Sequence, residues 1–395
     1  MASFQKYTTK DGVRWMYKYY STIDPVTGKK KQSTKRGFKS KKEAQLDAAA
    51  VELEITNGTF VKEKSITFAE FAPKWLKIYS STQHVKVSTV ASRQVSLNRL
   101  LKNFKHIMLK DISNEMYQDY LISLKNKGYS KETIISTHAT AKLLFKKAKQ
   151  MEIIKTNPTL DAIVPAFTQT VDEIENEVEL PKYFEKNELV HFLQVAKKNG
   201  MDKDYPTFLT LAYTGMRVGE LCALKWKDID FEKKTIRITK TYWNKTNDTV
   251  KYTLNTPKSK ASKRTILIDD ELISELKKFK TMQKEVIIRH RKEYYDEDFV
   301  FAKLTQFYGY PEKPKVIGDR LKRLLKLAEL NESLTPHSFR HTHTSLLAEA
   351  GVGLTEIMER LGQRNEKITR NVYMHVTKKL KTDAVEKFQK LMNGI

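Results

Sequence analysis

The spacing of apolar and polar residues differs between successive parts of the 395-residue chain. Residues 13–20 are rich in aromatic and basic side chains and predict a β-strand. A turn signal over 24–28 leads into a second, basic strand over 29–38, and a helical pattern follows over 41–57. We therefore expect residues 1–64 to form a small module of a sheet and one helix.

Residues 65–168 carry apolar side chains at helical spacing throughout. Each run of this spacing follows a residue type that caps helices. The four expected helices begin near Thr67, Ser88, Ser113 and Ser130. Their apolar stripes include Val95, Met116 and Ile135 and predict the core of a compact helical bundle.

An acidic stretch without clear periodicity, residues 169–180, separates this bundle from the rest of the chain and is expected to be a linker. From residue 181 onward helical and strand patterns mix. Strands are expected over 235–240, 250–254 and 264–268, and helices over 185–198, 204–213, 217–225, 270–291, 316–328, 337–349, 354–361 and 366–372. The predicted fold is mainly α, with a mixed α/β domain over 181–395.

The charge of the chain narrows its partners. It contains 72 Lys and Arg against 47 Asp and Glu, a formal net charge of +25. The excess is spread over 1–64, 65–168 and 180–395, whereas a membrane-surface protein concentrates it on one amphipathic helix. We therefore expect nucleic acid as the partner, which the motifs described below make double-stranded DNA, and no membrane contact. In the first module the expected DNA contacts are the basic and aromatic residues Arg14, Tyr17, Lys18, Lys29, Lys31, Lys35 and Arg36.

Cysteine usage and hydropathy exclude other classes. The single cysteine, Cys222, lies in an apolar helical stretch, which excludes internal disulfides and cysteine-based metal sites. No apolar run is long enough to span a bilayer, so an intracellular, cytoplasmic protein is expected. His341 and His343 lie at i and i+2 of an expected helix and therefore point apart. This spacing favours a packing or supporting role for both residues over metal binding.

A set of basic residues with one tyrosine carries the candidate chemistry: Arg217, Lys258, His337, Arg340 and Tyr373. Arginine is always charged and binds phosphate with two donors, so Arg217 and Arg340 suit a scissile phosphate. Tyr373 is the expected nucleophile, and Lys258 the acid that protonates the leaving oxygen. This chemistry needs no metal, nucleotide or other cofactor.

Local signals place these side chains. Gly215 is expected to end one helix, so that Arg217 opens the next and shares a phosphate with its N-terminus. Thr335 and Pro336 predict a helix start that puts His337 and Arg340 on one face. Lys258 lies between two expected strands, as a mobile hairpin lysine would, and Lys260 competes with it for that role.

The segments TGMRVGEL, TPKSKASKRTILI, TPHSFRHTHTSLLAEAGV, ERLGQ and NVYMHVT occur in this order over residues 214–377. In these segments the chain resembles the tyrosine recombinase family, and its whole length resembles phage- and genomic-island-type integrases. The resemblance implies a domain that binds arm sites, a domain that binds core sites and a catalytic domain. It further implies a 3′-phosphotyrosyl intermediate, a homotetramer on DNA, and a bacterial, nucleoid-associated protein that integrates and excises a mobile element. An excision directionality factor and a host DNA-bending protein are further partners that the sequence leaves open.

One position departs from the family pattern. Relatives carry histidine, or sometimes tryptophan, where this chain has Gln363. An amide can donate a hydrogen bond to phosphate but carries no charge, and Arg364 is placed to supply it. Gln363 is retained as a candidate catalytic residue, and Glu220 either supports the site or lies on the surface. The alternatives are a related DNA-relaxing enzyme and a catalytically impaired DNA-binding regulator with the same fold.

Overall fold

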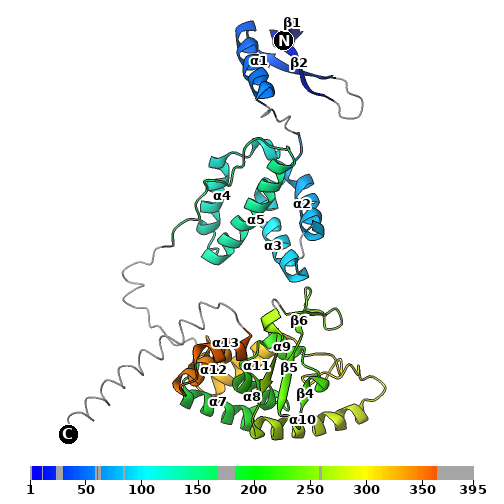
Figure 1. Ribbon diagram of the computed structural model, residues 1–395, viewed down its shortest axis with the longest axis vertical. Coiled ribbons are helices and arrows are strands. Elements are labelled where there is room, and N and C mark those ends of the chain that lie inside the picture. Colours follow the sequence, from blue (N-terminus) through cyan, green and yellow to red (C-terminus); the bar gives the residue numbers. More distant parts are fainter. Residues whose placement is uncertain are drawn as a thin grey trace, which may run out of the picture. The chain divides into compact units, whose positions relative to one another are not determined.

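The computed structural model describes residues 2–10, 12–23, 30–57, 60, 64–82, 85–167, 183–257 and 260–362. At 21–23, 31 and 260 it describes the backbone alone. Contacts divide the chain into two compact units, Met1–Val171 and Asp172–Ile395, and Figure 1 labels most of their elements. Within the described residues, no helix combines the length and apolar character needed to cross a bilayer.

The first module of unit one is an antiparallel sheet covered on one face by a helix. Its elements are β1 (Ser3–Thr9), β2 (Gly12–Ile23), β3 (Lys30–Phe38) and α1 (Lys41–Thr56). The strands lie in the order β1-β2-β3, and α1 packs against β2 and β3. Strand β1 was not predicted, because polar residues occupy most of its positions. It forms by pairing along β2, whose first residue, Gly12, pairs with Thr9 and has φ +111°.

The second part of unit one is the expected helical bundle. Its helices are α2 (Phe68–Thr82), α3 (Val87–Phe104), α4 (Asn114–Asn126) and α5 (Lys131–Gln150). Ser113 and Ser130 cap α4 and α5 as predicted, by accepting hydrogen bonds from Met116 N and Thr133 N at 3.1 and 3.3 Å. Trp75 and other aromatic rings fill the core.

Three residues of the predicted apolar stripes lie at the surface of this bundle. Val95, Met116 and Ile135 are 51%, 38% and 46% exposed. Each is next in sequence to a buried residue. The buried face of each helix is therefore narrower than the sequence pattern suggested.

Over residues 183–257 and 260–362, the second unit combines helices with two small sheets. Its helices are α7 (Lys186–Asn199), α8 (Asp204–Thr214), α9 (Val218–Cys222), α10 (Asp270–Arg289), α11 (Pro314–Leu327), α12 (Ser338–Glu349) and α13 (Leu354–Leu361). Its strands are β4 (Ile229–Asp230), β5 (Thr235–Ile238), β6 (Thr241–Trp243), β7 (Thr253–Asn255) and β8 (Arg264–Leu267). Helix α8 is buried along almost its whole length and packs against α7, α10 and α12 (Figure 1).

The strand pairing differs from the prediction in a way that affects Lys258. Strand β7 pairs with β6, whereas β8 pairs with β5 in the sheet β4-β5-β8. The predicted hairpin between 250–254 and 264–268 is therefore wrong, because these two strands belong to different sheets. The segment between them is a crossover connection, and its described end forms the short 3₁₀ turn η3 (Lys260–Ser262).

Cys222 is buried in the core of this unit, as predicted, and its burial raises the pKa of the thiol. The expected helix over 217–225 is shorter than predicted. It ends at Cys222 in α9, and a 3₁₀ turn, η2 (Trp226–Asp228), follows. There the carboxylate of Asp228 accepts a hydrogen bond from Lys225 N at 3.1 Å, which closes the new turn.

Candidate active site

Arg217 stands at the turn between α8 and α9. Gly215 ends α8 with φ +59°, a left-handed conformation that favours glycine. A Cβ at this position would also lie 2.8 Å from side-chain atoms of both His343 and Leu361. The turn places Arg217 at the N-cap of α9, with its side chain 34% exposed. The prediction that Gly215 ends one helix and Arg217 opens the next is confirmed.

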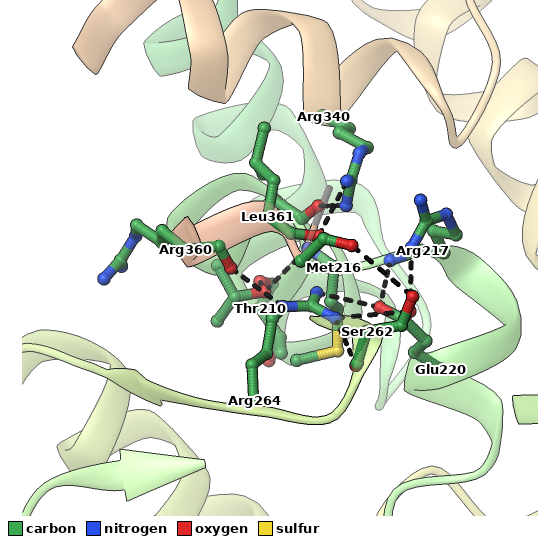
Figure 2. A network of polar contacts seen from close by, with 12 residues as sticks. Thr210, Met216, Arg217, Glu220, Ser262, Arg264, Arg340, Arg360 and Leu361 are labelled. Atoms are coloured by element: carbon green, nitrogen blue, oxygen red, sulfur yellow. Dashed lines mark hydrogen bonds and ion pairs between the residues drawn. The ribbon is translucent and has the colours of Figure 1, made fainter. Parts of the chain in front are cut away.

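Glu220 holds Arg217 in this position. Its carboxylate accepts hydrogen bonds from Arg217 N at 3.0 Å and Arg217 Nη1 at 3.1 Å (Figure 2). On its other side the same carboxylate accepts from Arg264 Nη2 at 2.9 Å and Nη1 at 3.3 Å. Burial would raise the pKa of Glu220, but the bonds from Arg264 and then Arg217 hold that pKa below its ordinary value. Glu220 is therefore a buried supporting carboxylate and no surface residue.

Helix α12 carries His337 and Arg340, and Phe339 anchors it. The Phe339 ring is fully buried. Its centroid lies 4.9 Å from the ring centroid of Phe184 and 5.6 Å from that of Phe208. The helix begins at Ser338, with His337 as its N-cap residue, so it starts later than Thr335 and Pro336 predicted. His337 is exposed, whereas Arg340 is buried.

The Arg340 guanidinium contacts both the turn after α8 and the C-terminal end of α13. Its side chain is 2% exposed, and Nη1 donates to Gly215 O at 3.0 Å while Nη2 donates to Leu361 O at 2.7 Å (Figure 2). These bonds fix the plane of the guanidinium next to the turn that carries Arg217. The structure therefore brings Arg217 and Arg340 together, although 123 positions separate them in the sequence.

The C-terminal end of α13 is held by side chains from distant parts of the chain. Arg264 Nε donates to Arg360 O at 2.8 Å, and Ser262 Oγ donates to Gly362 O at 3.4 Å. With the bond from Arg340 to Leu361 O, three successive carbonyl groups at this helix end have side-chain donors. Gly362 ends the helix with φ +67°.

His343 and Arg360 contact each other and the last turn of α8. His343 Nδ1 lies 2.8 Å from Ala212 O, and Arg360 Nε lies 3.0 Å from His343 Nε2. The imidazole therefore donates from Nδ1 and accepts at Nε2, as neutral histidine does. Burial, followed by the nearby Arg360, lowers the pKa of His343 to about 4. The predicted packing or supporting role of His343 fits this position.

Arg360 also ties α13 to two neighbouring elements. Its Nη1 donates to Leu267 O in β8, and its Nη2 donates to Tyr213 O near the end of α8, both at 3.0 Å. His341, the other histidine considered for metal binding, places its ring edge-on to that of His337, with 4.8 Å between ring centroids.

Several predicted site residues lie outside the described residues. These are Lys258, Gln363, Tyr373, the alternative Arg364, and Lys29 of the first module, together with the side chains of Lys31 and Lys260. Their catalytic and DNA-binding roles stay predictions. In the sequence, Lys258 precedes η3 by two positions and Gln363 follows Gly362 directly.

Of the predicted DNA contacts in the first module, Tyr17 requires correction. Its side chain is fully buried against α1, and its hydroxyl donates to Asp47. This burial, with the bond to Asp47, raises the pKa of Tyr17. Tyr17 is therefore a core residue of the module, because β2 alternates and every second residue faces the helix.

The remaining predicted contacts divide between the two faces of the sheet. Lys35 pairs with Tyr17 across the strands and forms an ion pair with Asp47 at 2.9 Å, so it lies on the face of the helix. Arg14 and Lys18 alternate with the helix-facing residues of β2, and Arg36 pairs with Met16. These three lie on the open face of the sheet, where a DNA contact stays a prediction.

Arg264 and Arg360 were not identified from the sequence. A signal for Arg264 exists, because strand alternation places it on the same face as the buried Ile266 and Ile268. An arginine on a buried face implies a buried partner. No local pattern marks Arg360, since its acceptors come from β8, α8 and α12.

Three family models match successive segments of the chain. The phage integrase family matches residues 182–379, an arm DNA-binding domain matches 3–55, and a phage integrase SAM-like domain matches 67–163. The chain belongs to the phage integrase family and is a tyrosine-type site-specific DNA recombinase. The expected family and fold class are thereby confirmed.

The chain is also similar to individual integrases in sequence and to solved integrase structures in fold. An integrase of Staphylococcus phage L54a is 29% identical over 86% of this chain and 97% of its own length. The ICEBs1 integrase of Bacillus subtilis is 26% identical over 94% and 95%, respectively. The structure of the Tn1549 transposon integrase in complex with a circular intermediate DNA covers 81% of this chain and all of its own, with TM-score 0.62 and 23% identity. A lambda integrase tetramer bound to a Holliday junction covers 93% and 94%, with TM-score 0.55 and 18% identity.

Proposed function

We propose that this recombinase exchanges DNA strands conservatively, through a 3′-phosphotyrosyl intermediate on Tyr373, to integrate and excise a mobile element. The convergence of Arg217 and Arg340 carries the proposal. Both guanidinium groups are fixed around Gly215, one by a buried carboxylate and one by two backbone carbonyls. Such fixed cations suit a reaction in which negative charge increases on a phosphate.

The reaction assigns one task to each residue. Tyr373 releases its phenolic proton to solvent, and its oxygen forms a bond to phosphorus as the bond from phosphorus to the 5′-oxygen breaks. Lys258 gives a proton to that leaving oxygen, while Arg217, His337 and Arg340 bind the non-bridging oxygens, and Gln363 donates a further hydrogen bond. The phosphotyrosine bond conserves the energy of the broken phosphodiester, so a 5′-hydroxyl from another strand can reverse the step.

The relatives support the proposed DNA and homotetramer partners. Integrases of a phage and of ICEBs1 support action on the attachment sites of a mobile element. The lambda integrase tetramer bound to a Holliday junction supports a homotetramer on DNA. We propose that residues 1–64 bind arm sites, residues 65–168 bind core sites, residues 169–180 connect them to the rest, and residues 181–395 catalyse. An excision directionality factor and a host DNA-bending protein remain part of the proposal.

Covalent trapping tests this function. Full-length protein is incubated in EDTA with nicked DNA that carries a candidate junction of the element, and binding is verified by gel shift. We expect wild type and Tyr308→Phe, which removes a hydroxyl elsewhere in the second unit, to give a covalent protein–DNA band on a denaturing gel. Tyr373→Phe should bind the same DNA and give none.

Binding by wild type without a covalent band, on DNA whose junction has been verified in the genome, would contradict the catalytic proposal. It would favour the impaired regulator, with Gln363 the first position to replace by histidine.

A further inference from the structure

Arg264 lies at the centre of the polar network in Figure 2, and no step of the proposed reaction uses it. It is the first residue of β8, and its side chain is 5% exposed. We propose that Arg264 is a positioning residue for strand cleavage, which fixes Glu220, and through it Arg217, against the C-terminal end of α13. The inference rests on the proposed function.

The bonds of this one guanidinium run in two directions. Its Nη1 and Nη2 donate to the carboxylate of Glu220 in α9, and Nη1 lies 3.3 Å from Ser262 O in η3. Its Nε donates at 2.8 Å to Arg360 O in α13. Three segments far apart in the sequence are thus joined by a planar group with a fixed fork of donors. Lysine, with a single nitrogen, cannot make these bonds together.

The charge of the cluster explains why a second arginine matters. With both arginines present, the group of Arg217, Arg264 and Glu220 carries a net charge of +1. Without Arg264, the buried carboxylate of Glu220 would have Arg217 as its remaining cation, and the net charge would fall to zero. Arg217 would then be drawn into its ion pair with Glu220, at the expense of a phosphate.

The turn after α13 is built around the same side chain. A Cβ at Gly362 would lie 2.9 Å from Arg264 Cδ, 3.1 Å from Arg264 Nη1 and 3.0 Å from Ala261 O. Glycine at 362 therefore allows both the left-handed backbone and the close approach of Arg264. This packing joins η3, which follows Lys258 in the sequence, to the chain position that precedes Gln363.

A neutral substrate separates positioning from folding. Wild type, Arg264→Gln and Arg264→Lys are compared on nicked DNA with an ordinary scissile phosphodiester and with a methylphosphonate, in which a methyl group replaces one charged oxygen. The matched control is Arg320→Gln. Arg320 also donates to a buried carboxylate of the second unit, Asp204, at 2.7 Å, and belongs to no part of the proposed site. Covalent adduct formation, DNA binding and thermal unfolding are measured for each full-length protein.

On the phosphodiester we expect Arg264→Gln to form adduct about 10²-fold more slowly than wild type, as misplaced catalytic groups do. Its melting temperature and DNA binding should resemble those of Arg320→Gln. On the methylphosphonate, where less negative charge needs neutralising, the defect should shrink at least about tenfold. If Arg264→Gln is unfolded at the assay temperature, Arg264→Lys should show the same preference for the neutral substrate.

Equal defects on both substrates, or a loss no greater than that of Arg320→Gln, would overturn the positioning role. Wild type reports separately on the proposed function, because its failure to form an adduct on either substrate would contradict that function before any variant is compared.

Discussion

Two clusters in the second unit hold a buried carboxylate between two arginines, one at each end of α8. Near the N-terminal end, Asp204 binds Arg320 Nη1 at 2.7 Å and Arg323 Nη2 at 3.1 Å. Beyond the C-terminal end, Glu220 binds Arg217 Nη1 at 3.1 Å and Arg264 Nη2 at 2.9 Å. The carboxylate side chains are 1% and 3% exposed, so the two clusters match in charge and in burial.

The clusters differ in the segments that they join. Arg320 and Arg323 come from one helix, α11, and Arg323 also donates to Asn199 O at the end of α7, so the Asp204 cluster fastens α11 to α8 and α7. The Glu220 cluster joins α9 and β8, and Arg264 extends it to the end of α13. The more exposed arginine of each cluster does not distinguish them, since the side chains of Arg217 and Arg323 are 34% and 38% exposed. The Glu220 cluster also contains Arg217, two positions after the Gly215 carbonyl that accepts from Arg340, so its place beside the second candidate arginine separates it from the Asp204 cluster.

The largest expected difference concerns the two partly exposed arginines. Arg217→Gln should slow covalent adduct formation by about 10²–10³-fold, because a fixed cation at the phosphate is lost. Arg323→Gln removes an equally exposed guanidinium from the Asp204 cluster and should cleave at close to the wild-type rate. Single-turnover trapping on nicked DNA measures both. Equal rates for the two variants would remove the functional distinction between the clusters.

Neutralising the carboxylates should give a smaller difference in cleavage. Asp204→Asn and Glu220→Gln each leave two arginines around a neutral amide and should lower the free energy of unfolding by about 3 kcal/mol. Glu220→Gln should in addition slow cleavage by about 10- to 10²-fold, because Arg217 loses its orienting partner. Denaturant unfolding and trapping are measured on the same preparations. A slow Asp204→Asn with normal Glu220→Gln would reverse the assignment.

The smallest effect is a pH dependence that belongs to the Glu220 end of α8. The pKa of His343 is about 4 in the folded state, against about 6.5 for an unfolded histidine. Its contribution to stability is therefore complete above pH 6.5 and is lost as pH falls toward 4. Between pH 7 and pH 5 this amounts to about 2 kcal/mol.

Denaturant unfolding of wild type and His343→Asn at pH 7, 6 and 5 tests this titration. Asparagine keeps a donor for Ala212 O and does not titrate, so the variant should lose less stability than wild type over this range. Parallel pH profiles of the two proteins would show that another group accounts for the dependence.

The sequence predicted those parts of the fold that depend on neighbouring residues. Helix periodicity located α2, α4, α5, α8 and α13, and Gly215 correctly placed Arg217 at a helix start. The order of motifs also indicated that Arg217, His337 and Arg340 act together. That grouping rested on the motif order together with the resemblance to the tyrosine recombinase family, whereas the helix starts followed from capping and the 3.6-residue repeat, which are local effects.

Features that depend on pairing between distant segments could not be predicted in this way. Strand β1 forms only along β2, and the strands on either side of Lys258 separate into different sheets. Tyr17 looked like a surface aromatic until strand register placed it under α1. The support around Glu220 depends on Arg264, 44 positions further along the chain, and local periodicity carries no information about such a contact.

The most direct test of the account identifies the residue that becomes linked to DNA. Wild-type protein trapped on nicked junction DNA is digested with nuclease and trypsin, and the nucleotide-bearing peptide is sequenced by mass spectrometry. The account predicts a nucleotide on Tyr373, within the tryptic peptide of residues 371–378. A nucleotide on any other residue, or an adduct that survives Tyr373→Phe, would contradict it.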